Sequence, residues 1–326
     1  MHKKTSVVFL LFAAAVCALL CSCGKEMRDN KTNIAVIVKA VDSDFWHNVQ
    51  DGVNSAATEL NVSVTFEGAV NEEDYYSQNK LIQNAIEQKV DAIVLSAISY
   101  DKSSELVDKA VRNGIKVVMI DSSVDTDLVN LFIGTDNYKA GQSAAQSAIE
   151  GFSDEVKINI GIVNVYESTQ NGRERENGFR DFVSQYANAQ ISGVVNVSSN
   201  TMSATAGALS LMYQHPEINV LVGFNEWTTL GVGNAIKQLG LSGKIKGIGF
   251  DTNVSCVEMV EDGTLNALIA QNPFSIGYLG IKAASELAAG SPSSFGEQKR
   301  LYTDVTTVTR ENLFDDDVQK IVFRFR

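Results

Sequence analysis

Several polar side chains that could bind a small molecule directly follow short apolar runs of the sequence. They are Asp121, Arg175, Asn225, Asp251 and Gln271. Carboxylates accept hydrogen bonds, a guanidinium donates them, and the amides of Asn and Gln do both. Together they provide the partners that a polyhydroxylated molecule requires, and bonds to charged groups are the stronger ones. For each residue alone the alternative is structural: Asp251 as a helix cap, Asn225 in a turn, or Arg175 in an ion pair with a nearby Glu.

Two large aromatic residues, Phe45 and Trp46, stand side by side after the first apolar run, residues 34–39. With Ser43 they introduce a helical pattern that extends to Leu60. Open α/β sheets bind ligands beyond the carboxyl ends of their strands, which is where this segment lies. The rings therefore either stack on a ligand at a cleft, partly exposed to solvent, or form the first core residues of the helix. We favour the cleft.

Motifs of enzyme active sites are absent from the sequence. There is no phosphate-binding loop and no nucleophile elbow, and Gly231 and Gly233 lack the third glycine of a dinucleotide fingerprint because Ile236 occupies its place. Beyond the N-terminal segment the histidines are His47 and His215, too few for a histidine metal cluster. We expect no catalysis, no metal and no cofactor.

The chain is acidic, with 39 Asp and Glu residues, 27 Lys and Arg residues and a formal net charge of −12. Binding to a polyanion needs clustered Lys and Arg to contact the phosphates. We therefore expect no nucleic acid partner.

From residue 33 onward, short runs rich in β-branched residues alternate with amphipathic stretches. The predicted strands are 34–39, 62–66, 92–96, 116–120, 131–134, 158–163, 191–197, 220–224, 245–249, 267–270 and 301–308. The predicted helices are 48–60, 75–88, 103–113, 175–186, 202–213, 228–239, 256–261 and 275–289. Near-continuous apolar strands separated by helices indicate parallel sheets covered on both faces. The pattern predicts an α/β fold of two similar halves, with residues 321–326 as an edge strand or a disordered tail.

Seven segments carry a family resemblance when taken together. They are DFW at 44–46, VVMIDSS at 117–123, IGTDNYKAG at 133–141, RERENGF at 173–179, HPEINVLVGFNE at 215–226, GIGFDTN at 247–253 and ALIAQNP at 267–273. Over about residues 33–313 the chain resembles the periplasmic binding proteins of the ribose and galactose type, most closely the ribose-binding branch. The resemblance implies two doubly wound, parallel-sheet (Rossmann-like) lobes, joined by a three-stranded hinge, that close on one sugar in the cleft between them.

The resemblance also implies positions for the ligand, the hinge and the lobes. The ligand-binding positions are Ser43, Phe45, Trp46, Asp121, Arg175, Asn225, Asp251 and Gln271. The hinge positions are Asp136, Asn137 and Asn272, with a third crossing near residues 301–304. The implied N-terminal lobe is 33–136 plus 272–300, and the C-terminal lobe is 137–271 plus 301–326.

Three residues depart from the ribose-binding pattern. Ser122 stands where that branch has an arginine, Ser199 stands about where it has a second stacking aromatic residue, and Ser43 replaces an asparagine. Trp227 either restores a ring on the second lobe or packs behind Glu226. Ser122, Ser199 and Trp227 are therefore secondary candidates for ligand binding, and the departures indicate a pocket reshaped for a ligand other than ribose.

The N-terminal segment has the features of an export signal: basic residues at its start, then the apolar run 7–20 and a region of small residues. The sequence before Cys23 resembles a bacterial lipoprotein box, which predicts a signal peptide at 1–22, a lipid on Cys23 and a polar tether at 23–32. Ordinary cleavage that leaves Cys23 as a free thiol is the alternative.

These expectations together describe a protein anchored by its lipid on the extracytoplasmic face of a bacterial membrane. We expect it to act as a monomer that delivers a monosaccharide or small polyol to an ABC permease. The alternative is a sensor that presents its ligand to a chemoreceptor or membrane kinase. A sugar-responsive repressor of the same fold would carry a DNA-binding helix pair where this chain has the export signal, and an enzyme would need a nucleophile and a base.

Overall fold

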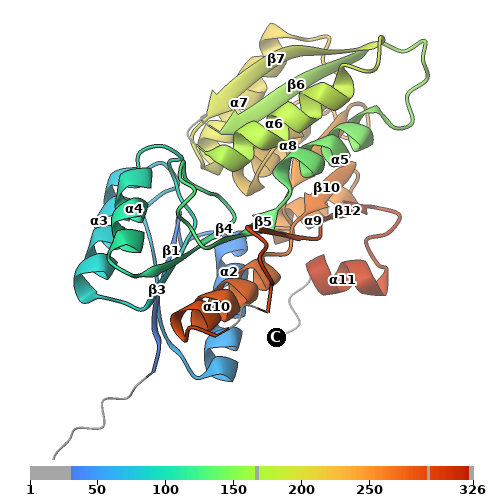
Figure 1. Ribbon diagram of the computed structural model, residues 1–326. Coiled ribbons are helices and arrows are strands. Elements are labelled where there is room, and N and C mark those ends of the chain that lie inside the picture. Colours follow the sequence, from blue (N-terminus) through green and yellow to red (C-terminus); the bar gives the residue numbers. More distant parts are fainter. Residues whose placement is uncertain (1–30, 166–168, 292–293, 323–326) are drawn as a thin grey trace, which may run out of the picture. The chain divides into compact units, whose positions relative to one another are not determined.

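The computed structural model describes residues 31–165, 169–291 and 294–322 (Figure 1). The fold lies in one compact unit, Thr32–Arg326. The predicted signal peptide, Cys23 and nearly all of the tether lie outside the described residues. Within the described part of the chain, no helix has both the length and the apolar character needed to cross a membrane.

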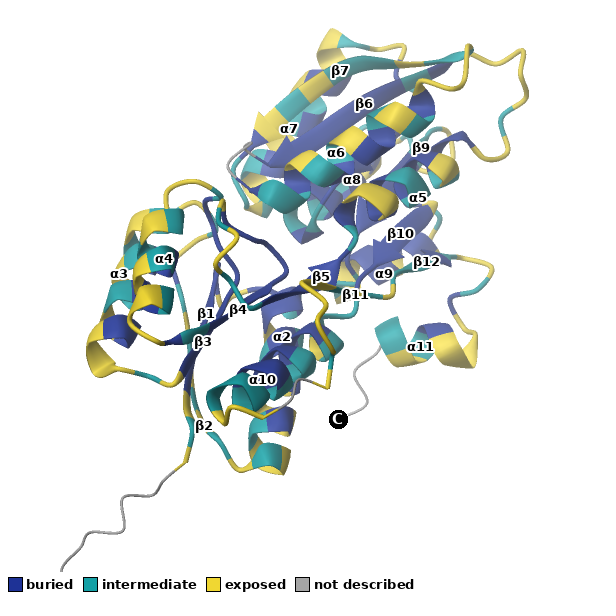
Figure 2. Ribbon diagram, in the orientation of Figure 1, coloured by how far each residue is buried: buried dark blue, intermediate teal, exposed yellow. Residues whose placement is uncertain are grey.

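The first sheet has six strands in the order β11-β5-β4-β3-β1-β2, and every neighbouring pair in it is parallel. Its strands are β1 (Asn33–Val38), β2 (Ser63–Gly68), β3 (Ala92–Leu95), β4 (Lys116–Ile120), β5 (Leu131–Thr135) and β11 (Arg300–Thr303). The central strands are buried along nearly their whole length (Figure 2). This burial on both faces explains why their sequences read as continuous apolar runs rather than as alternating patterns.

The second sheet also has six strands, in the order β12-β10-β9-β8-β6-β7. Its strands are β6 (Ile158–Val165), β7 (Ala189–Val197), β8 (Val220–Gly223), β9 (Lys246–Phe250), β10 (Ala267–Ala270) and β12 (Thr306–Thr309). Strand β12 is antiparallel to β10, and the other pairs are parallel. The fold class predicted from the sequence is confirmed.

Helices cover both faces of each sheet. Helices α2 (Asp44–Leu60), α3 (Tyr75–Gln88), α4 (Ser104–Arg112) and α10 (Pro273–Ala288) pack on the first sheet. Helices α5 (Asn137–Ile149), α6 (Gln170–Val183), α7 (Thr201–Gln214), α8 (Glu226–Gln238) and α9 (Val254–Glu261) pack on the second. Four clusters of buried apolar residues fill these interfaces, two for each sheet.

Helices α5 and α6 approach each other so closely that glycine is required at two positions. A Cβ atom at Gly141 would overlap the carbonyl oxygen of Arg175, and one at Gly178 would overlap that of Tyr138. A larger residue would push the helices apart, because cores have little free space to relax into. Gly141 therefore helps to set where the backbone of Arg175 lies.

The chain passes between the sheets three times: from β5 to α5, from β10 to α10, and from β11 to β12. The single strand predicted at 301–308 is wrong, since β11 and β12 belong to different sheets. Residues 301–303, which we assigned to the C-terminal lobe, pair with β5 of the first sheet. The predicted boundary between the lobes therefore shifts to after residue 303. The sequence did not show the change of sheet, because β-branched residues occur on both sides of the crossing.

The C-terminal end also differs from expectation. Helix α11 (Asp316–Val322) contains Ile321 and Val322, so neither an edge strand nor a disordered tail describes these two residues. Its first turn carries Asp316 and Asp317, which stabilise a helix N-terminus. Residues 323–326 lie outside the described part of the chain.

Candidate functional site

A hollow of about 460 Å³, part of it open to solvent, lies among side chains from both sheets. Its lining contains all eight positions predicted for the ligand: Ser43, Phe45, Trp46, Asp121, Arg175, Asn225, Asp251 and Gln271. It also contains Lys39, Glu72, Val165, Thr169, Asn171, Gly172, Phe224, Glu226 and Trp227. The structure thus brings together residues that are separated by more than half of the chain.

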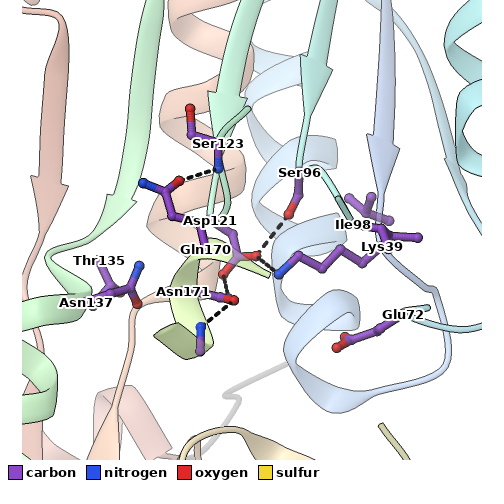
Figure 3. Close-up of polar contacts among 12 residues, drawn as sticks. Lys39, Glu72, Ser96, Ile98, Asp121, Ser123, Thr135, Asn137, Gln170 and Asn171 are labelled. Atoms are coloured by element: carbon purple, nitrogen blue, oxygen red, sulfur yellow. Dashed lines mark hydrogen bonds and ion pairs between the residues drawn. The ribbon is translucent and has the colours of Figure 1, made fainter. Parts of the chain in front are cut away.

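Asp121 forms the polar centre of the first-sheet side of this cavity (Figure 3). Its Oδ2 lies 2.9 Å from the Nζ of Lys39 and accepts a hydrogen bond from the Ser96 hydroxyl at 2.9 Å. Its Oδ1 accepts a bond of 3.3 Å from the Asn171 side-chain amide, which comes from helix α6. Burial opposes the charge of Asp121, but Lys39 and Arg175 outweigh it and lower the pKa of the carboxyl. Asp121 is therefore a fixed carboxylate.

Asp251 and Gln271 form the corresponding centre on the second sheet. The Gln271 amide donates to Asp251 Oδ1 at 2.7 Å, and both side chains are buried. Burial raises the pKa of Asp251, while Arg175 and Gln271 partly offset that rise. The carboxyl of Asp251 is thus less firmly ionised than that of Asp121.

Arg175 lies at the back of the cavity and is only 2% exposed. Its guanidinium donates to Asn137 Oδ1 at 2.9 Å, to the Phe224 carbonyl at 2.6 Å and to Gln271 Oε1 at 2.8 Å. It also lies over the Phe250 ring, 4.5 Å from the centroid. A guanidinium has five N–H groups, so these three bonds leave two for a ligand. Neutral acceptors, rather than the neighbouring Glu residues, hold it in place.

Phe45 and Trp46 line the cavity and also belong to the core of the first sheet. Their rings meet edge to face, with centroids 4.9 Å apart. Phe45 is 9% exposed and Trp46 is 2% exposed, so the partial exposure that we expected is wrong. The Trp46 indole N–H donates to Glu72 Oε1 at 2.8 Å, which satisfies its one donor inside the protein. Phe45 and Trp46 therefore belong to the core and also line the cavity, because helix α2 begins at the edge of the cavity.

Two lining residues act as helix caps, a role that the sequence analysis considered only for Asp251, whereas Asn253 caps the helix that follows Asp251. Ser43 Oγ accepts from the Trp46 backbone N–H at 3.4 Å at the start of α2. Asn225 Oδ1 accepts from the Thr228 backbone N–H at 2.9 Å in a capping box at the start of α8. A helix N-terminus thus faces the cavity from each sheet, with backbone N–H groups and a positive end directed toward it.

A family model described as a periplasmic binding protein domain matches residues 34–292. The chain belongs to this family. A solute-binding protein of an ABC transporter from Agrobacterium vitis, solved with bound D-fucose, is 32% identical and superposes with a TM-score of 0.84, covering 89% of this chain and 100% of that one. A carbohydrate transporter solute-binding protein from Agrobacterium radiobacter, solved with D-arabinose, is 26% identical with a TM-score of 0.86, covering 90% and 100%.

Curated periplasmic binding proteins give the same result. The D-ribose/D-allose-binding protein of Pseudomonas aeruginosa is 25% identical over 287 residues, which is 86% of this chain and 89% of the relative. The D-allose-binding periplasmic protein of Escherichia coli is 26% identical over 255 residues, covering 76% and 82%. The resemblance inferred from the seven sequence segments is confirmed.

The secondary candidates of this periplasmic binding protein divide between the cavity and its surroundings. Trp227 is half-buried and lines the cavity. Ser122 and Ser199 are not among the lining residues. Ser122 Oγ is buried without a hydrogen-bond partner, and the Ser199 backbone N–H donates to Glu73 Oε1 at 2.9 Å, which joins elements of the two sheets. Both serines lie in turns that follow strands, Ser122 after β4 and Ser199 after β7, and the sequence does not show which way the side chains of a turn face.

The predicted hinge residues occupy the first two crossings. Asp136 caps α5 and Asn272 caps α10, each through its side-chain oxygen. Asn137 is buried and accepts from Arg175. The crossing at Asn137 is thereby connected directly to the cavity.

Several polar residues of the cavity were missed by the sequence analysis. Lys39 directly follows strand β1 and is only 2% exposed, and its position after the apolar run IAVIV was the one signal in the sequence. Glu72 lies in the loop after β2, where nothing in the sequence marks it. Glu226 is adjacent to Asn225. Its side-chain carboxyl accepts from the Phe45 backbone N–H at 3.3 Å and from the Asn253 side-chain amide at 3.1 Å, and both donors are distant in the chain.

The missed acidic residues have altered acidity. Burial raises the pKa of Glu226 to about 7, and the nearby charge of Asp251 adds to the shift. Burial also raises the pKa of Glu72, against the attraction of Lys39. No group of His, Cys, Asp and Glu in the described ranges is arranged to hold a metal ion. The arrangement can donate and accept hydrogen bonds and stack on an apolar ligand face.

Proposed function

We propose that this protein binds one monosaccharide or small polyol in the cavity and delivers it to an ABC permease. The observation that carries this proposal is the convergence of Asp121, Arg175 and Asp251, from both sheets, on one hollow of about 460 Å³. Carboxylates and a guanidinium beside aromatic rings match the hydroxyl groups and apolar face of a sugar. The related solute-binding proteins solved with D-fucose and D-arabinose support this ligand class.

We propose binding rather than catalysis, because the related proteins are named as sugar-binding and solute-binding proteins. The cavity contains carboxylates, amides and a guanidinium, which can donate and accept hydrogen bonds. Lys39 is held by Asp121, and Ser43 caps a helix. Ligand that contacts both sheets at once stabilises the arrangement in which they are close, and the permease then distinguishes bound from free protein.

Localisation follows from the N-terminal segment. We propose that Cys23 is lipidated, that residues 24–32 tether the body to the extracytoplasmic face of the membrane, and that the body works as a monomer. Stable anchoring requires two lipid signals, since one acyl chain binds only marginally. Cys23→Ala protein should lose palmitate labelling and leave the membrane fraction, whereas Cys256→Ala should retain both. Continued labelling of the Cys23→Ala protein would refute the anchor.

A thermal-shift screen of residues 24–326 against pentoses, hexoses and polyols tests the binding function. A ligand at about one hundred times its dissociation constant adds about 2.7 kcal/mol to the free energy of unfolding. Hits should then be measured by calorimetry in wild type, in Arg175→Ala and in Arg180→Ala, an arginine of the same helix that pairs with Glu176 on its surface. Equal affinity in all three proteins would place the site elsewhere.

A further inference from the structure

A second, smaller hollow adjoins the cavity. The two share the lining residues Phe45, Glu226, Asp251 and Gln271. The other residues of the smaller hollow are Asp44, Asn48, Thr252, Asn253 and Pro273. Glu226 and Asp251 thus stand between two connected spaces.

The two hollows differ in whether their carboxyl groups have a positively charged partner. At the first-sheet end, Asp121 is neutralised by Lys39 at 2.9 Å. The smaller hollow is lined by the three carboxyl groups of Asp44, Glu226 and Asp251, and no Lys or Arg is among its lining residues. Unpaired buried charge is costly, so this end of the site favours a cation.

The hydrogen-bond donors to Glu226 in the smaller hollow are uncharged. This side chain is only 5% exposed and accepts from two uncharged donors, the Phe45 backbone N–H at 3.3 Å and the Asn253 amide at 3.1 Å. The same Asn253 amide donates to Asp44 Oδ2 at 2.9 Å, so it bridges two carboxyl groups. Arg175 partly offsets Asp251, whereas the charged groups around Glu226 are Asp251 and Asp44.

We propose that the ligand carries a protonated amine beside Glu226 and Asp251, and is therefore an amino sugar or aminopolyol. This inference rests on the proposed function and specifies its ligand class. An ammonium group donates three hydrogen bonds and supplies positive charge at the smaller hollow, where no Lys or Arg is among the lining residues. A metal ion is disfavoured, because the acidic groups of the described residues do not converge as metal ligands. The hydroxyl groups of the ligand would face Asp121 and Arg175 at the other end.

The acidity of Glu226 supports the same assignment. Burial and Asp251 raise its pKa to about 7, so the free protein at neutral pH holds this carboxyl partly protonated. Asp44 from α2 and Asp251 after β9 face it, together with the uncharged Phe45 and Asn253 donors. A bound ammonium would favour the ionised carboxylate, and a proton would be released on binding.

Matched ligands test the proposal. We would measure binding to residues 24–326 of D-glucosamine, D-galactosamine and 1-amino-1-deoxyalditols, each beside the parent compound with a hydroxyl in place of the amine. The alditol amines titrate like a Lys side chain and stay charged near neutral pH. For a pair whose ring or chain fits, the amine should bind at least about tenfold more tightly, as expected for one charged hydrogen bond. Calorimetry in two buffers should show proton release with the amine alone.

Two variants locate the effect. Glu226→Gln should reduce the ratio of amine affinity to parent-compound affinity to near onefold. Glu87→Gln, the same change on the exposed face of α3, should keep the full preference. Parents that bind as well as or better than their amines in wild type would overturn this inference and leave the sugar-binding function standing. Failure of both members of every pair, and of the wider sugar screen, would overturn the function and this inference with it.

Discussion

Asp121 and Asp251 occupy the same place in the two sheets. Each follows the strand next to a crossing strand, and each adopts a left-handed backbone, with φ of 56° and 68°. The backbone N–H of Asp121 donates to the Ile133 carbonyl at 3.0 Å, and that of Asp251 donates to the Ile269 carbonyl at 3.1 Å. Residues other than glycine rarely hold this conformation, and strained positions of this kind cluster at binding sites. The two carboxyl groups nevertheless differ, since the pKa of Asp121 is lowered and that of Asp251 is raised.

Loss of the Asp121 charge should destabilise the fold. Asp121→Asn leaves Lys39 buried without its counterion, which costs about 3–5 kcal/mol in comparable buried pairs. Urea unfolding of the wild type and of Asp121→Asn measures the difference, and Asp154→Asn in an exposed loop is the control. The double variant Lys39→Met/Asp121→Asn should recover part of the loss. A cost no larger than that of the control would contradict the ion pair.

The ion pair of Lys39 and Asp121 also predicts that the stability of the fold falls at acidic pH. Because the folded pKa of Asp121 is below the unfolded value of 3.8, its contribution is present above that value and is lost as the pH falls through the folded pKa. Wild type should therefore lose more stability than Asp121→Asn on acidification below about pH 4. Parallel acid-unfolding curves would count against this prediction.

Arg175→Ala should weaken ligand binding by about 2–4 kcal/mol, because it removes a charged donor and leaves buried acceptors unpaired. If Arg175 only lined the cleft, Arg175→Ala would leave the free energy of unfolding unchanged. The three protein acceptors of Arg175 instead predict a loss of about 1–3 kcal/mol in unfolding free energy as well. Calorimetry and urea unfolding measure the two effects, with Arg180→Ala as the control. Unchanged affinity with reduced stability would show that Arg175 supports the fold and that the ligand binds elsewhere.

Trp46→Ala should cost about 3–5 kcal/mol of stability, the usual range for a buried aromatic side chain. The ring is in the core of the first sheet, although it also lines the cavity. Trp46→Phe keeps most of the buried area but loses the bond to Glu72, so its cost should be smaller. Melting temperatures of the unliganded proteins check both variants. A melting temperature of Trp46→Ala within a few degrees of the wild type would show that the ring is not a core residue.

Glu226 predicts a stability change near neutral pH. Its folded pKa of about 7 exceeds the unfolded value of 4.5, so its stabilising contribution is complete below pH 4.5 and is lost as the pH rises through about 7. Between pH 5 and pH 8 the wild type should lose roughly 2–3 kcal/mol more than Glu226→Gln. Urea unfolding across this range tests the effect. Glu87→Gln should follow the wild-type profile, and the same profile for Glu226→Gln would contradict the raised pKa.

The sequence by itself determined the fold class and the line of polar residues at the strand ends. Apolar runs separated by amphipathic stretches are local signals, and in a parallel sheet the carboxyl ends of neighbouring strands lie along one edge. Asp121 and Asp251 were found in this way, because each directly follows its strand. Phe45 and Trp46 were expected before a helix at 48–60, whereas α2 begins at Asp44 and contains both residues.

Tertiary structure decided which of these residues meet and how their charges balance. Glu226 acquires its high pKa from burial and from Asp251, and its Phe45 donor lies 181 residues away in the chain. Lys39 is only the last residue of a predicted strand until the fold brings Asp121 within 2.9 Å of it. The division of residues 300–309 between two sheets likewise depends on pairing with β5 and β10, which no local pattern encodes. Local periodicity specifies elements and their edges, whereas burial and charge pairing arise only when distant segments exclude water together.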